Sequence, residues 1–426
     1  MTGDKKGGAD VLGLIDIGTS KICCTIVVPN RGGDKRSGPQ VIGIGHQRSQ
    51  GVKAGVVVDL HEAETAVRAA VAQAERMAGV QLEEVIVGVS CGRMRSNHFA
   101  ARADLESGAV RKDDLRRLTQ AARAYAERDG RLPLYLDRLI YRIDGDAGVQ
   151  EPIGMAGNRL TADVHAITAD EAPLRNLKLL IERCYLSLGS AIPSALASIL
   201  AVTSEEERRI GITCLDIGGG TTSISVFADN RFLLADVVPI GGQHMTFDIA
   251  RELGTPIPEA ERIKALYGTL VSAGSDEHEM FTYPLAGEGD SAFHQTTRAR
   301  LRAILQPRVE GLLALVNERM QRSEIMRYAG ERVVLTGGAS QLVGIDEFAA
   351  NALGRPVRVA RPFSTGGSSG PSGGLPANMS LPAFACVAGL LPAAQMVQGG
   401  WASFPEYGVG EHGYFGRMGQ WLRQSF

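Results

Sequence analysis

Short apolar runs broken by glycine turns alternate along the chain with segments in which apolar residues recur at helical spacing. Residues 11–15 and 22–28 are apolar runs on either side of a tight turn, and they predict two strands joined by a hairpin. Residues 61–79 carry apolar positions at helical spacing and end at a glycine, which is typical of a helix, and the β-branched run 85–89 predicts another strand. The pattern indicates a mixed α/β protein.

The opening pattern returns 200 residues later. Asp16-Ile17-Gly18 and Asp216-Ile217-Gly218 each stand between two apolar runs, so an internal duplication is the simplest account. A strand at 332–335 is followed by Thr336-Gly337-Gly338-Ala339 and by a helix at 341–353, the order found at ligand-binding edges of α/β proteins. Periodicity also predicts helices at 112–128, 175–185, 195–202, 246–253, 259–267, 297–328 and 383–397, and strands at 139–143, 162–167 and within 210–227.

The composition is that of a folded protein without a strong overall charge. Of 426 residues, 44% are hydrophobic and 22% are charged, which excludes a disordered chain or a fibrous repeat. A net charge of -2 argues against nucleic acid as a partner. The six cysteines form no Cys-x-x-Cys pair, so neither zinc nor a disulfide framework is expected. No apolar run approaches the ~20 residues of a membrane span and no apolar leader is evident, so we expect a cytoplasmic chain that does not cross the membrane.

Both glycine turns have the chemistry of an anion-binding hairpin. Missing or short side chains let phosphate oxygens approach successive backbone N–H groups. Two such hairpins that face each other could hold the two ends of a triphosphate, so we predict a nucleotide site. Its predicted phosphate-binding residues are Gly18, Thr19, Ser20 and Lys21 in the first turn and Gly218, Gly219, Gly220, Thr221 and Thr222 in the second.

An aspartate precedes each turn. A carboxylate cannot lie directly against phosphate, but it can hold water molecules of Mg²⁺, which keeps much of its hydration shell beside nucleotides. We therefore expect Asp16 and Asp216 to bind Mg²⁺ through water. The alternative is a pair of ordinary glycine-containing β-turns. The duplication, the lysine of the first turn, the three consecutive glycines of the second and the later Gly-Gly turn favour the nucleotide site, and neither a Rossmann nor a Walker sequence is present.

The order of these motifs resembles that of the actin, Hsp70 and sugar-kinase superfamily of ATP-binding proteins, and within it the FtsA family of bacterial cell-division proteins. The resemblance extends from Leu12 to the C-terminus. It implies an actin-like, two-lobed ATP-binding α/β fold with an inserted small α/β subdomain in the first half and a C-terminal amphipathic helix, and ATP with Mg²⁺ as the ligand. Its most specific segments are LIDIGTSK, EEVIVGVS, PIGMAGNRLTADVHAIT, CLDIGGGTTSISVF, GGQHMTFDIA, EAERIKALYG and VVLTGGASQLVGI.

The resemblance also assigns the adenosine end of the site. It implies that Gly337, Gly338 and Ala339 back the adenosine, while Glu261 and Lys264 reach the adenine and the ribose. Glu261 and Lys264 are three residues apart on one predicted helix, so a surface ion pair is the alternative.

The resemblance further divides the chain into units. The inserted subdomain would contact other division proteins and neighbouring copies in a filament, although the charge pattern of its basic helix favours a solvated face over a binding patch. The expected units are a disordered tail at 1–10; a first lobe formed by 11–82, 167–204 and 381–397; the inserted subdomain at 83–166; a second lobe formed by 205–242 and 325–363; a small subdomain at 243–324; a Gly/Ser-rich loop at 364–380; a linker at 398–412; and a helix at 413–426.

Hydrolysis of ATP requires a group that orients or deprotonates the attacking water. By resemblance, Ser194 stands about where bacterial actins of the MreB type have a glutamate. A serine is a poor general base. We therefore expect slow turnover at most, with ATP acting mainly as a structural ligand that closes the cleft and favours polymerisation.

Residues 413–426 have one apolar face when placed on a helix at ~100° per residue. The segment lacks acidic residues, which is typical of a helix in a membrane interface. The Gly- and Pro-containing linker at 398–412 would let this helix reach a lipid surface. A terminal helix docked on the core of the protein is the alternative. The predicted membrane-binding residues are Tyr414, Phe415, Met418, Trp421, Leu422 and Phe426, with Arg417 and Arg423 beside them.

The resemblance implies an ATP-binding protein that forms filaments on the cytoplasmic face of the bacterial inner membrane at the division site. It would tether the ring of tubulin-like FtsZ to the lipid and recruit later division proteins. The FtsZ C-terminal peptide would bind within 243–324, where Arg298, Arg302 and Arg308 offer basic groups unless they only solvate a helix face. A sugar- or acetate-kinase-like phosphotransferase and a pilus-assembly platform remain as alternatives, and the apolar C-terminal segment and the motif match disfavour both.

Overall fold

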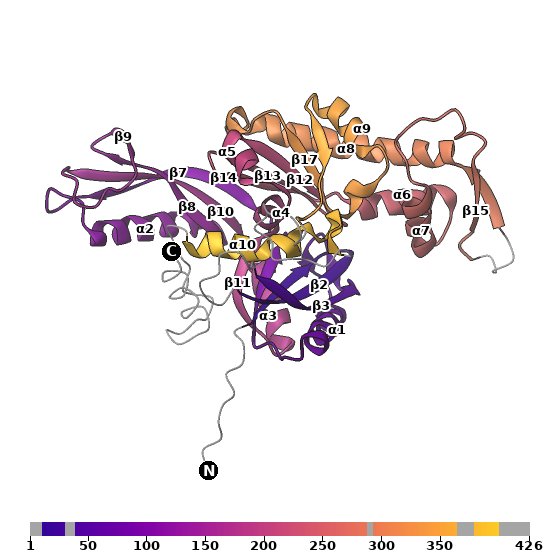
Figure 1. Ribbon diagram of the computed structural model, residues 1–426, viewed down its shortest axis with the longest axis horizontal. Helices are drawn as coiled ribbons and strands as arrows, with labels where there is room; N and C mark the ends of the chain where they lie inside the picture. The colour runs from indigo at the N-terminus through magenta and orange to yellow at the C-terminus, as the bar shows by residue number, and fades with distance from the viewer. Residues whose placement is uncertain (1–10, 30–38, 288–292, 364–378, 400–426) are drawn as a thin grey trace, which may run out of the picture.

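The computed structural model describes residues 11–29, 39–287, 293–363 and 379–399. These residues form two five-stranded sheets, one four-stranded sheet and two short hairpins, with helices packed on the sheets. The two five-stranded sheets lie one above the other in Figure 1, and two smaller units extend from them to opposite ends of the molecule.

The first lobe is built on a sheet of strand order β11-β6-β1-β2-β3. Its strands β1 and β2 form the predicted hairpin, and β6 and β11 run parallel to β1. The bounds are β1 (Leu12–Ile17), β2 (Lys21–Val28), β3 (Gln40–Arg48), β4 (Val52–Lys53), β5 (Val56–Val57), α1 (Leu60–Ala78), β6 (Glu84–Val89), α3 (Glu171–Arg183) and β11 (Ser187–Pro193). The Asp59 side chain caps α1 by accepting from the first-turn N–H groups of His61 and Glu62, and Gly79 ends the helix in the left-handed conformation.

The second lobe repeats this arrangement with the strand order β14-β13-β12-β17-β18. Asp16 is paired with Cys23 and lies beside Gly88 of the parallel strand, and Asp216 is paired with Ser223 and lies beside Thr336. The repeated sequence pattern therefore corresponds to a repeated strand arrangement, as predicted. The bounds are α5 (Glu205–Ile210), β12 (Ile212–Ile217), β13 (Thr222–Ala228), β14 (Arg231–Val238), η2 (Glu324–Tyr328), β17 (Val333–Thr336), η3 (Gly338–Gln341), α9 (Ile345–Leu353) and β18 (Val357–Val359).

Two helices lie between the sheets: α4 (Ser194–Val202) and α10 (Ala385–Gly399), the latter preceded by η5 (Pro382–Phe384). All nine residues of α4 are buried. A Cβ atom at Gly389 would lie 1.7 Å from the carbonyl oxygen of Ala197, so only glycine lets the two helices pack this closely. The close packing of α4 and α10 therefore depends on this glycine.

The inserted subdomain is a four-stranded sheet of order β7-β10-β8-β9 with one helix packed on it. It has a core of its own, in which Leu118 of the helix meets Leu160 and Val164 of the sheet. The bounds are β7 (Arg95–Asp104), α2 (Lys112–Ala126), η1 (Arg128–Gly130), β8 (Arg131–Ile143), β9 (Asp146–Val149) and β10 (Arg159–Asp170).

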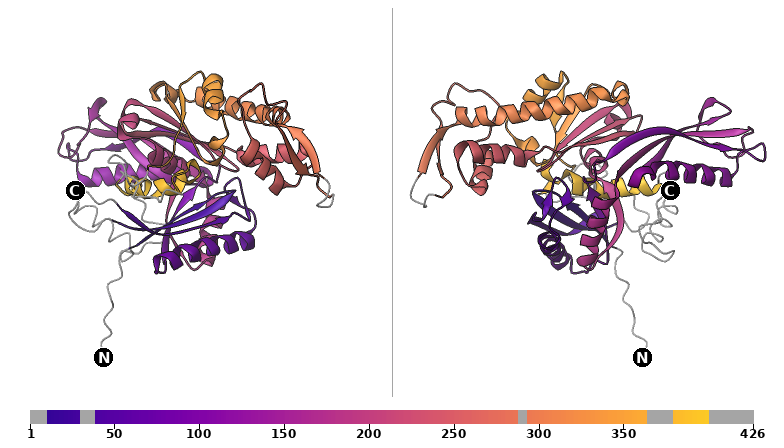
Figure 2. Two further views of the ribbon diagram at one scale, coloured as in Figure 1. Left: turned by 45° about the vertical axis from the view of Figure 1, so that its right-hand side comes forward. Right: turned by 180° about the vertical axis from the view of Figure 1, so that it is seen from behind.

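The small subdomain lies at the other end of the molecule, as both views of Figure 2 show. Its described residues form three helices and a hairpin. Its bounds are α6 (Gly242–Leu253), α7 (Ile257–Tyr267), β15 (Met280–Pro284), β16 (Phe293–Thr297) and α8 (Arg298–Arg322). The long helix α8 carries a continuous buried stripe from Leu301 to Met320, which packs with α6 and the second-lobe sheet into one core. The small subdomain and the second-lobe sheet therefore share one core.

Several boundaries differ from those predicted. The helix expected at 297–328 ends at Arg322 because Ser323 is extended, and the helix expected at 341–353 begins at Ile345 after a 3₁₀ turn. The expected C-terminal helix, the linker from residue 400, the loop at 364–378 and the tail at 1–10 lie outside the described residues. Within the described part of the chain, no helix has the length and apolarity that a membrane crossing requires.

Candidate functional site

The two predicted phosphate hairpins meet across the lobes. Gly18 N–H donates to the Lys21 carbonyl at 3.0 Å and Gly218 N–H to the Thr221 carbonyl at 2.9 Å, so the two turns have the same internal bond. A Cβ atom at Gly219 would lie 2.0 Å from Ser20 Oγ, and one at Gly220 would lie 2.5 Å from Thr19 Oγ1. The glycines of the second hairpin are therefore required for its close approach to the first.

The start of α6 is fixed to the second hairpin. Gly242 N–H donates to the Gly218 carbonyl at 2.9 Å and Gln243 N–H to the Gly219 carbonyl at 2.8 Å. The Gln243 side chain also crosses to the first lobe, where its Nε2 lies 3.3 Å from the Thr19 carbonyl oxygen. Residues of the small subdomain thus take part in the contact between the hairpins.

Asp16 and Asp216 lie in one electrostatic environment at the ends of β1 and β12. Each is partly exposed, yet the dense protein around them disfavours the ionised form. The pKa of Asp216 is raised to about 6, mainly by desolvation and also by the nearby charge of Asp16, while a hydrogen bond from Ser198 and the charge of Lys21 oppose the rise. Desolvation also raises the pKa of Asp16, against which the Lys21 ammonium acts. Two such carboxylates attract a cation.

Two small polar side chains hold this pair of aspartates. Ser198 Oγ of α4 donates to Asp216 Oδ2 at 2.5 Å, and the Cys386 thiol of α10 is hydrogen-bonded to Asp16. The described residues contain no group of three or more His, Cys, Asp or Glu side chains that could hold a metal ion. Mg²⁺ dehydrates reluctantly, so two carboxylates are a donor set that fits an ion held through water.

Lys21 lies at the edge of the site. Its Nζ donates to the Ala383 carbonyl and lies 4.8 Å from the centre of the Phe384 ring. Both partners belong to η5, whose Pro382 carbonyl also accepts from Gly337 N–H at 3.1 Å. The first hairpin and the Gly-Gly turn of the second lobe are therefore linked through η5.

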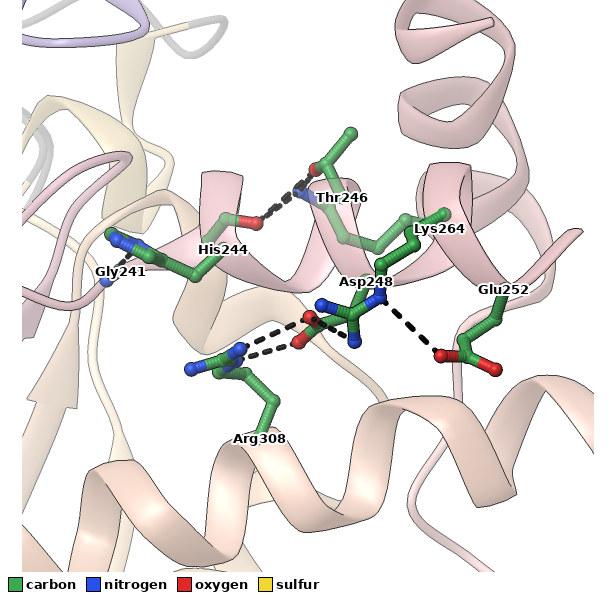
Figure 3. A network of polar contacts seen from close by, with 9 residues as sticks. Gly241, His244, Thr246, Asp248, Glu252, Lys264 and Arg308 are labelled. Atoms are coloured by element: carbon green, nitrogen blue, oxygen red, sulfur yellow. Dashed lines mark hydrogen bonds and ion pairs between the residues drawn. The ribbon is translucent and has the colours of Figure 1, made fainter. Parts of the chain in front are cut away.

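The predicted adenosine residues come together from three segments. A Cβ atom at Gly242 would lie 3.0 Å from Ala339 Cβ and 3.6 Å from Lys264 Nζ. Lys264 Nζ donates to Glu261 Oε2 at 2.7 Å, so the ion pair considered as the alternative is present. Lys264 also donates to Thr246 Oγ1 at 2.7 Å and to the Gly242 carbonyl at 3.0 Å, so it ties α7 to the start of α6 (Figure 3).

Gly337 and Gly338 form the turn that follows β17. Gly337 adopts a φ of 86°, and a Cβ atom there would lie 2.2 Å from Asp216 Oδ1. Glycine is thus required both by the backbone conformation and by the proximity of the aspartate. The structure places this turn directly beside the second hairpin.

The first turn of α4 carries no carboxylate or glutamine. Ser194 begins the helix, has 7% of its surface exposed and is hydrogen-bonded to the Cys386 thiol. The glutamine near the hairpins is Gln243 on α6, which the sequence interpretation missed. Ser198, Thr246 and Cys386 were missed as well. For Ser198 a signal existed, since a hydroxyl in an otherwise apolar helix needs a partner.

The three arginines expected to receive a partner peptide are all paired within the chain. Arg298 pairs with Glu279 at 2.5 Å, Arg302 with Asp276 at 2.7 Å and Arg308 with Asp248 at 2.6 Å. Figure 3 shows the two-bond contact between Arg308 and Asp248. A groove of about 460 Å³ lies between α6 and α8 and is lined by Asp248, Arg251, Glu252, Arg300, Ala303, Ile304, Pro307 and Arg308.

Solved structures with this architecture include the PilM–PilN type IV pilus biogenesis complex, with a TM-score of 0.60, 16% identity and coverage of 90% of this chain and 98% of the other. MreB5 of Spiroplasma citri bound to AMPPNP has a TM-score of 0.52 and 12% identity, with coverage of 98% and 99%. Together with the duplicated lobes and facing hairpins, these likenesses define an actin-like protein with an inserted subdomain.

Sequence comparison assigns the family. A family model described as "Cell division protein FtsA" matches residues 213–389, and one described as "SHS2 domain inserted in FTSA" matches residues 91–168. Cell division protein FtsA of Agrobacterium fabrum is 39% identical over 430 residues, covering 98% of this chain and 95% of that protein. Its counterpart in Escherichia coli is 31% identical, covering 84% and 85%. The chain belongs to the FtsA family of cell division proteins.

Proposed function

We propose that the chain binds Mg-ATP between its lobes, forms filaments on the cytoplasmic face of the inner membrane at the division site and tethers the FtsZ ring there. The observation that carries the nucleotide part is the contact between the two glycine hairpins beside Asp16 and Asp216. Family membership supports the division role, and MreB5 of Spiroplasma citri, a protein of the same fold, has been solved bound to AMPPNP.

In this proposal each lobe contributes half of the phosphate site. Backbone N–H groups of Gly18 to Lys21 and of Gly218 to Thr222 would bind the phosphates. Asp16 and Asp216 would hold Mg²⁺ through water, positioned by Cys386 and Ser198. The bound ion would supply the positive charge that offsets the two desolvated carboxylates. The adenosine would lie against Glu261, Lys264 and the turn formed by Gly337, Gly338 and Ala339. Together the residues of the site would link the lobes.

Turnover would be slow at most. Ser194 is engaged with Cys386, and a serine is a weak base for water activation. The Gln243 side-chain amide lies 3.3 Å from the Thr19 carbonyl oxygen of the first hairpin, and a glutamine can orient water without deprotonating it. A rate above about 1 s⁻¹, the low end of ordinary enzymes, would contradict this part of the proposal.

The FtsZ C-terminal peptide is proposed to bind the groove between α6 and α8. Of the three predicted arginines only Arg308 lines this groove, and it would contribute as a member of its ion pair with Asp248, whereas Arg298 and Arg302 pair with Glu279 and Asp276 outside the lining. Arg300 is exposed on the same groove and forms no ion pair with the described residues of the chain. An acidic peptide would therefore gain most from Arg300, with Ile304 and Pro307 as apolar contacts.

Fluorescence titration of an FtsZ C-terminal peptide tests this assignment. Arg300→Glu should weaken binding about tenfold, in the range for a charge reversal at an interface. The matched control is Arg361→Glu, which reverses an exposed arginine on the second lobe away from the groove. Equal losses in both variants would show that overall charge, and not the groove, governs binding.

The inserted subdomain is proposed to contact neighbouring copies and other division proteins. Its helix α2 exposes Arg116 and Arg117, which are paired with Asp113 and with Glu106 and Asp114. This pairing supports the solvated-face interpretation of the helix. Exposed apolar side chains at Tyr125, Ile153 and Met155 are the better candidates for a protein contact.

Membrane attachment is proposed to reside in residues 413–426, beyond the described end of α10. Electron microscopy on anionic lipid monolayers with Mg-ATP should show filaments for the full chain and none for a chain ending at Gly413. Lipid binding without filaments would favour a pilus-type platform, and absence of lipid binding would remove the tether from the proposal. An assay of soluble phosphoryl acceptors would detect a phosphotransferase.

A further inference from the structure

The inserted subdomain contacts both lobes, although its two chain connections lead only into the first. Strand β7, at one edge of its sheet, lies next to β14, the edge strand of the second-lobe sheet. Figure 1 shows these strands adjoining above α10. Side chains of the subdomain bond to backbone groups of β14, and the Arg231 side chain of β14 donates to the Arg138 carbonyl of the subdomain at 3.3 Å.

His165 is at the centre of this contact. It is fully buried, its Nδ1 lies 2.7 Å from the Phe232 carbonyl oxygen and its Nε2 lies 2.5 Å from Ser96 Oγ. A carbonyl oxygen only accepts, so Nδ1 carries the proton and Nε2 of the neutral ring accepts from the Ser96 hydroxyl. Ser96 Oγ then accepts from Ala235 N–H at 3.3 Å. The donors and acceptors form one consistent chain from Phe232 to Ala235, which we call the relay.

Packing around the relay keeps the imidazole neutral and fixed. The ring of His98 stacks on that of His165 with centroids 4.5 Å apart and planes 5° apart, and Phe232 meets His165 edge to face at 5.9 Å. Burial and then the proximity of His98 lower the pKa of His165 to about 3. The relay is therefore intact throughout the neutral pH range.

The same end of the subdomain is also held at the chain connections that lead into the first lobe. Arg131, with 8% of its surface exposed, donates to the Thr168 carbonyl and to the Arg93 carbonyl, each at 2.8 Å, and pairs with Asp170. Asp170 N–H donates to the Gly92 carbonyl at 2.7 Å. These bonds close the neck through which both chain connections pass.

We propose that the inserted subdomain is a strut between the lobes, in which the relay of His165 and Ser96 to β14 restrains rotation of the second lobe relative to the first. Helices α4 and α10 already pack between the lobes, and α4 contacts β14 as well. The relay adds a polar attachment at β14, and each further attachment restricts a rotation that packing alone permits. This inference does not require a nucleotide, so it is tested in the nucleotide-free protein and its failure leaves the proposed ATP site untouched.

The test compares Ser96→Ala, Ser96→Thr and Ser107→Ala in the full chain. Ser96→Ala removes the bridging hydroxyl and Ser96→Thr retains it. Ser107→Ala removes a hydroxyl that bonds only to the Ala109 carbonyl in an exposed turn of the same subdomain. Hydrogen exchange at the Ala235 amide measures whether its bond to Ser96 is intact. Spin labels at Arg76→Cys on α1 and Glu347→Cys on α9, in a Cys184→Ala background, report the distance between the lobes.

In Ser96→Ala, exchange at Ala235 should accelerate about fivefold, the change expected from loss of one ordinary hydrogen bond. The interlobe distance distribution should broaden and gain a longer component. Ser96→Thr and Ser107→Ala should match the parent protein. The strut is refuted if Ala235 exchange rises while the distance distribution stays unchanged. Unchanged exchange at Ala235, or a Ser96→Thr variant that behaves like Ser96→Ala, would equally overturn it.

Discussion

Replacement of Asp216 by asparagine should stabilise the nucleotide-free protein while it weakens the ligand site. Asparagine has the same shape and can still accept from Ser198 through Oδ1, but it carries no charge. Desolvation raises the pKa of Asp216 from 3.8 to about 6. One pKa unit is worth about 1.4 kcal/mol, so ionisation costs the folded state about 3 kcal/mol, an upper bound because water reaches the cleft side.

The raised pKa of Asp216 determines how the free energy of unfolding changes with pH. Between pH 3.8 and 6 the unfolded chain loses the proton first, so stability falls as the pH rises, and the full cost is present above pH 6. Asp216→Asn removes this cost. Its free energy of unfolding should exceed that of the parent protein by up to about 3 kcal/mol at pH 8 and by only about 1 kcal/mol at pH 4.5.

Urea unfolding of the nucleotide-free proteins at the two pH values measures the effect. The control is Asp229→Asn, a substitution in an exposed turn where Asp229 has a φ of 51°, a conformation that asparagine tolerates. Mg-ATP affinity should fall at least tenfold in Asp216→Asn only. A variant that is less stable than the parent at pH 8, or a gain that is the same at both pH values, would refute the reasoning.

Three further predictions concern the hairpins, the subdomain contact and the α6–α8 groove. Gly219→Ala should lower ATP affinity at least tenfold because its Cβ would lie 2.0 Å from Ser20 Oγ, whereas Gly311→Ala, with open space around it, should bind normally in the same titration. The pKa of His165 is lowered to about 3, so the unfolded state takes up the proton first as the pH falls below 6.5. Thermal unfolding should therefore show a loss of about 1.4 kcal/mol per pH unit between pH 6 and 4 that is absent in His165→Asn. Arg308→Ala should lower the free energy of unfolding by about 1–2 kcal/mol because Asp248 loses a two-bond partner, and Arg308→Lys should recover part of it in urea titrations.

The sequence predicted the features that backbone chemistry dictates. Asp16, Gly18, Asp216 and Gly218 belong to hairpins whose turns need glycine and whose pattern repeats, so the pattern of residues alone reveals their equivalence. The resemblance of the motifs also predicted an actin-like fold and an inserted subdomain. The structural likeness to MreB5 of Spiroplasma citri and the match to the SHS2 family model confirm both.

Features that depend on contacts between distant segments could not be predicted. Strand β7 has polar residues on both sides and gave no apolar alternation, so it was missed together with its contact to β14. Ser96 and Ala235 are 139 residues apart, and no local pattern connects them. The arginines of α8 looked free in the sequence because Asp248, the partner of Arg308, lies 60 residues away.

Calorimetric titration of the full chain with ATP, in the presence of Mg²⁺ and then of a chelator, tests the central claim most directly. One ATP per chain should bind with Mg²⁺, and affinity should fall at least tenfold on chelation and in Gly219→Ala alike. An ATP affinity that changes neither on chelation of Mg²⁺ nor in Gly219→Ala would contradict a site formed between the two lobes.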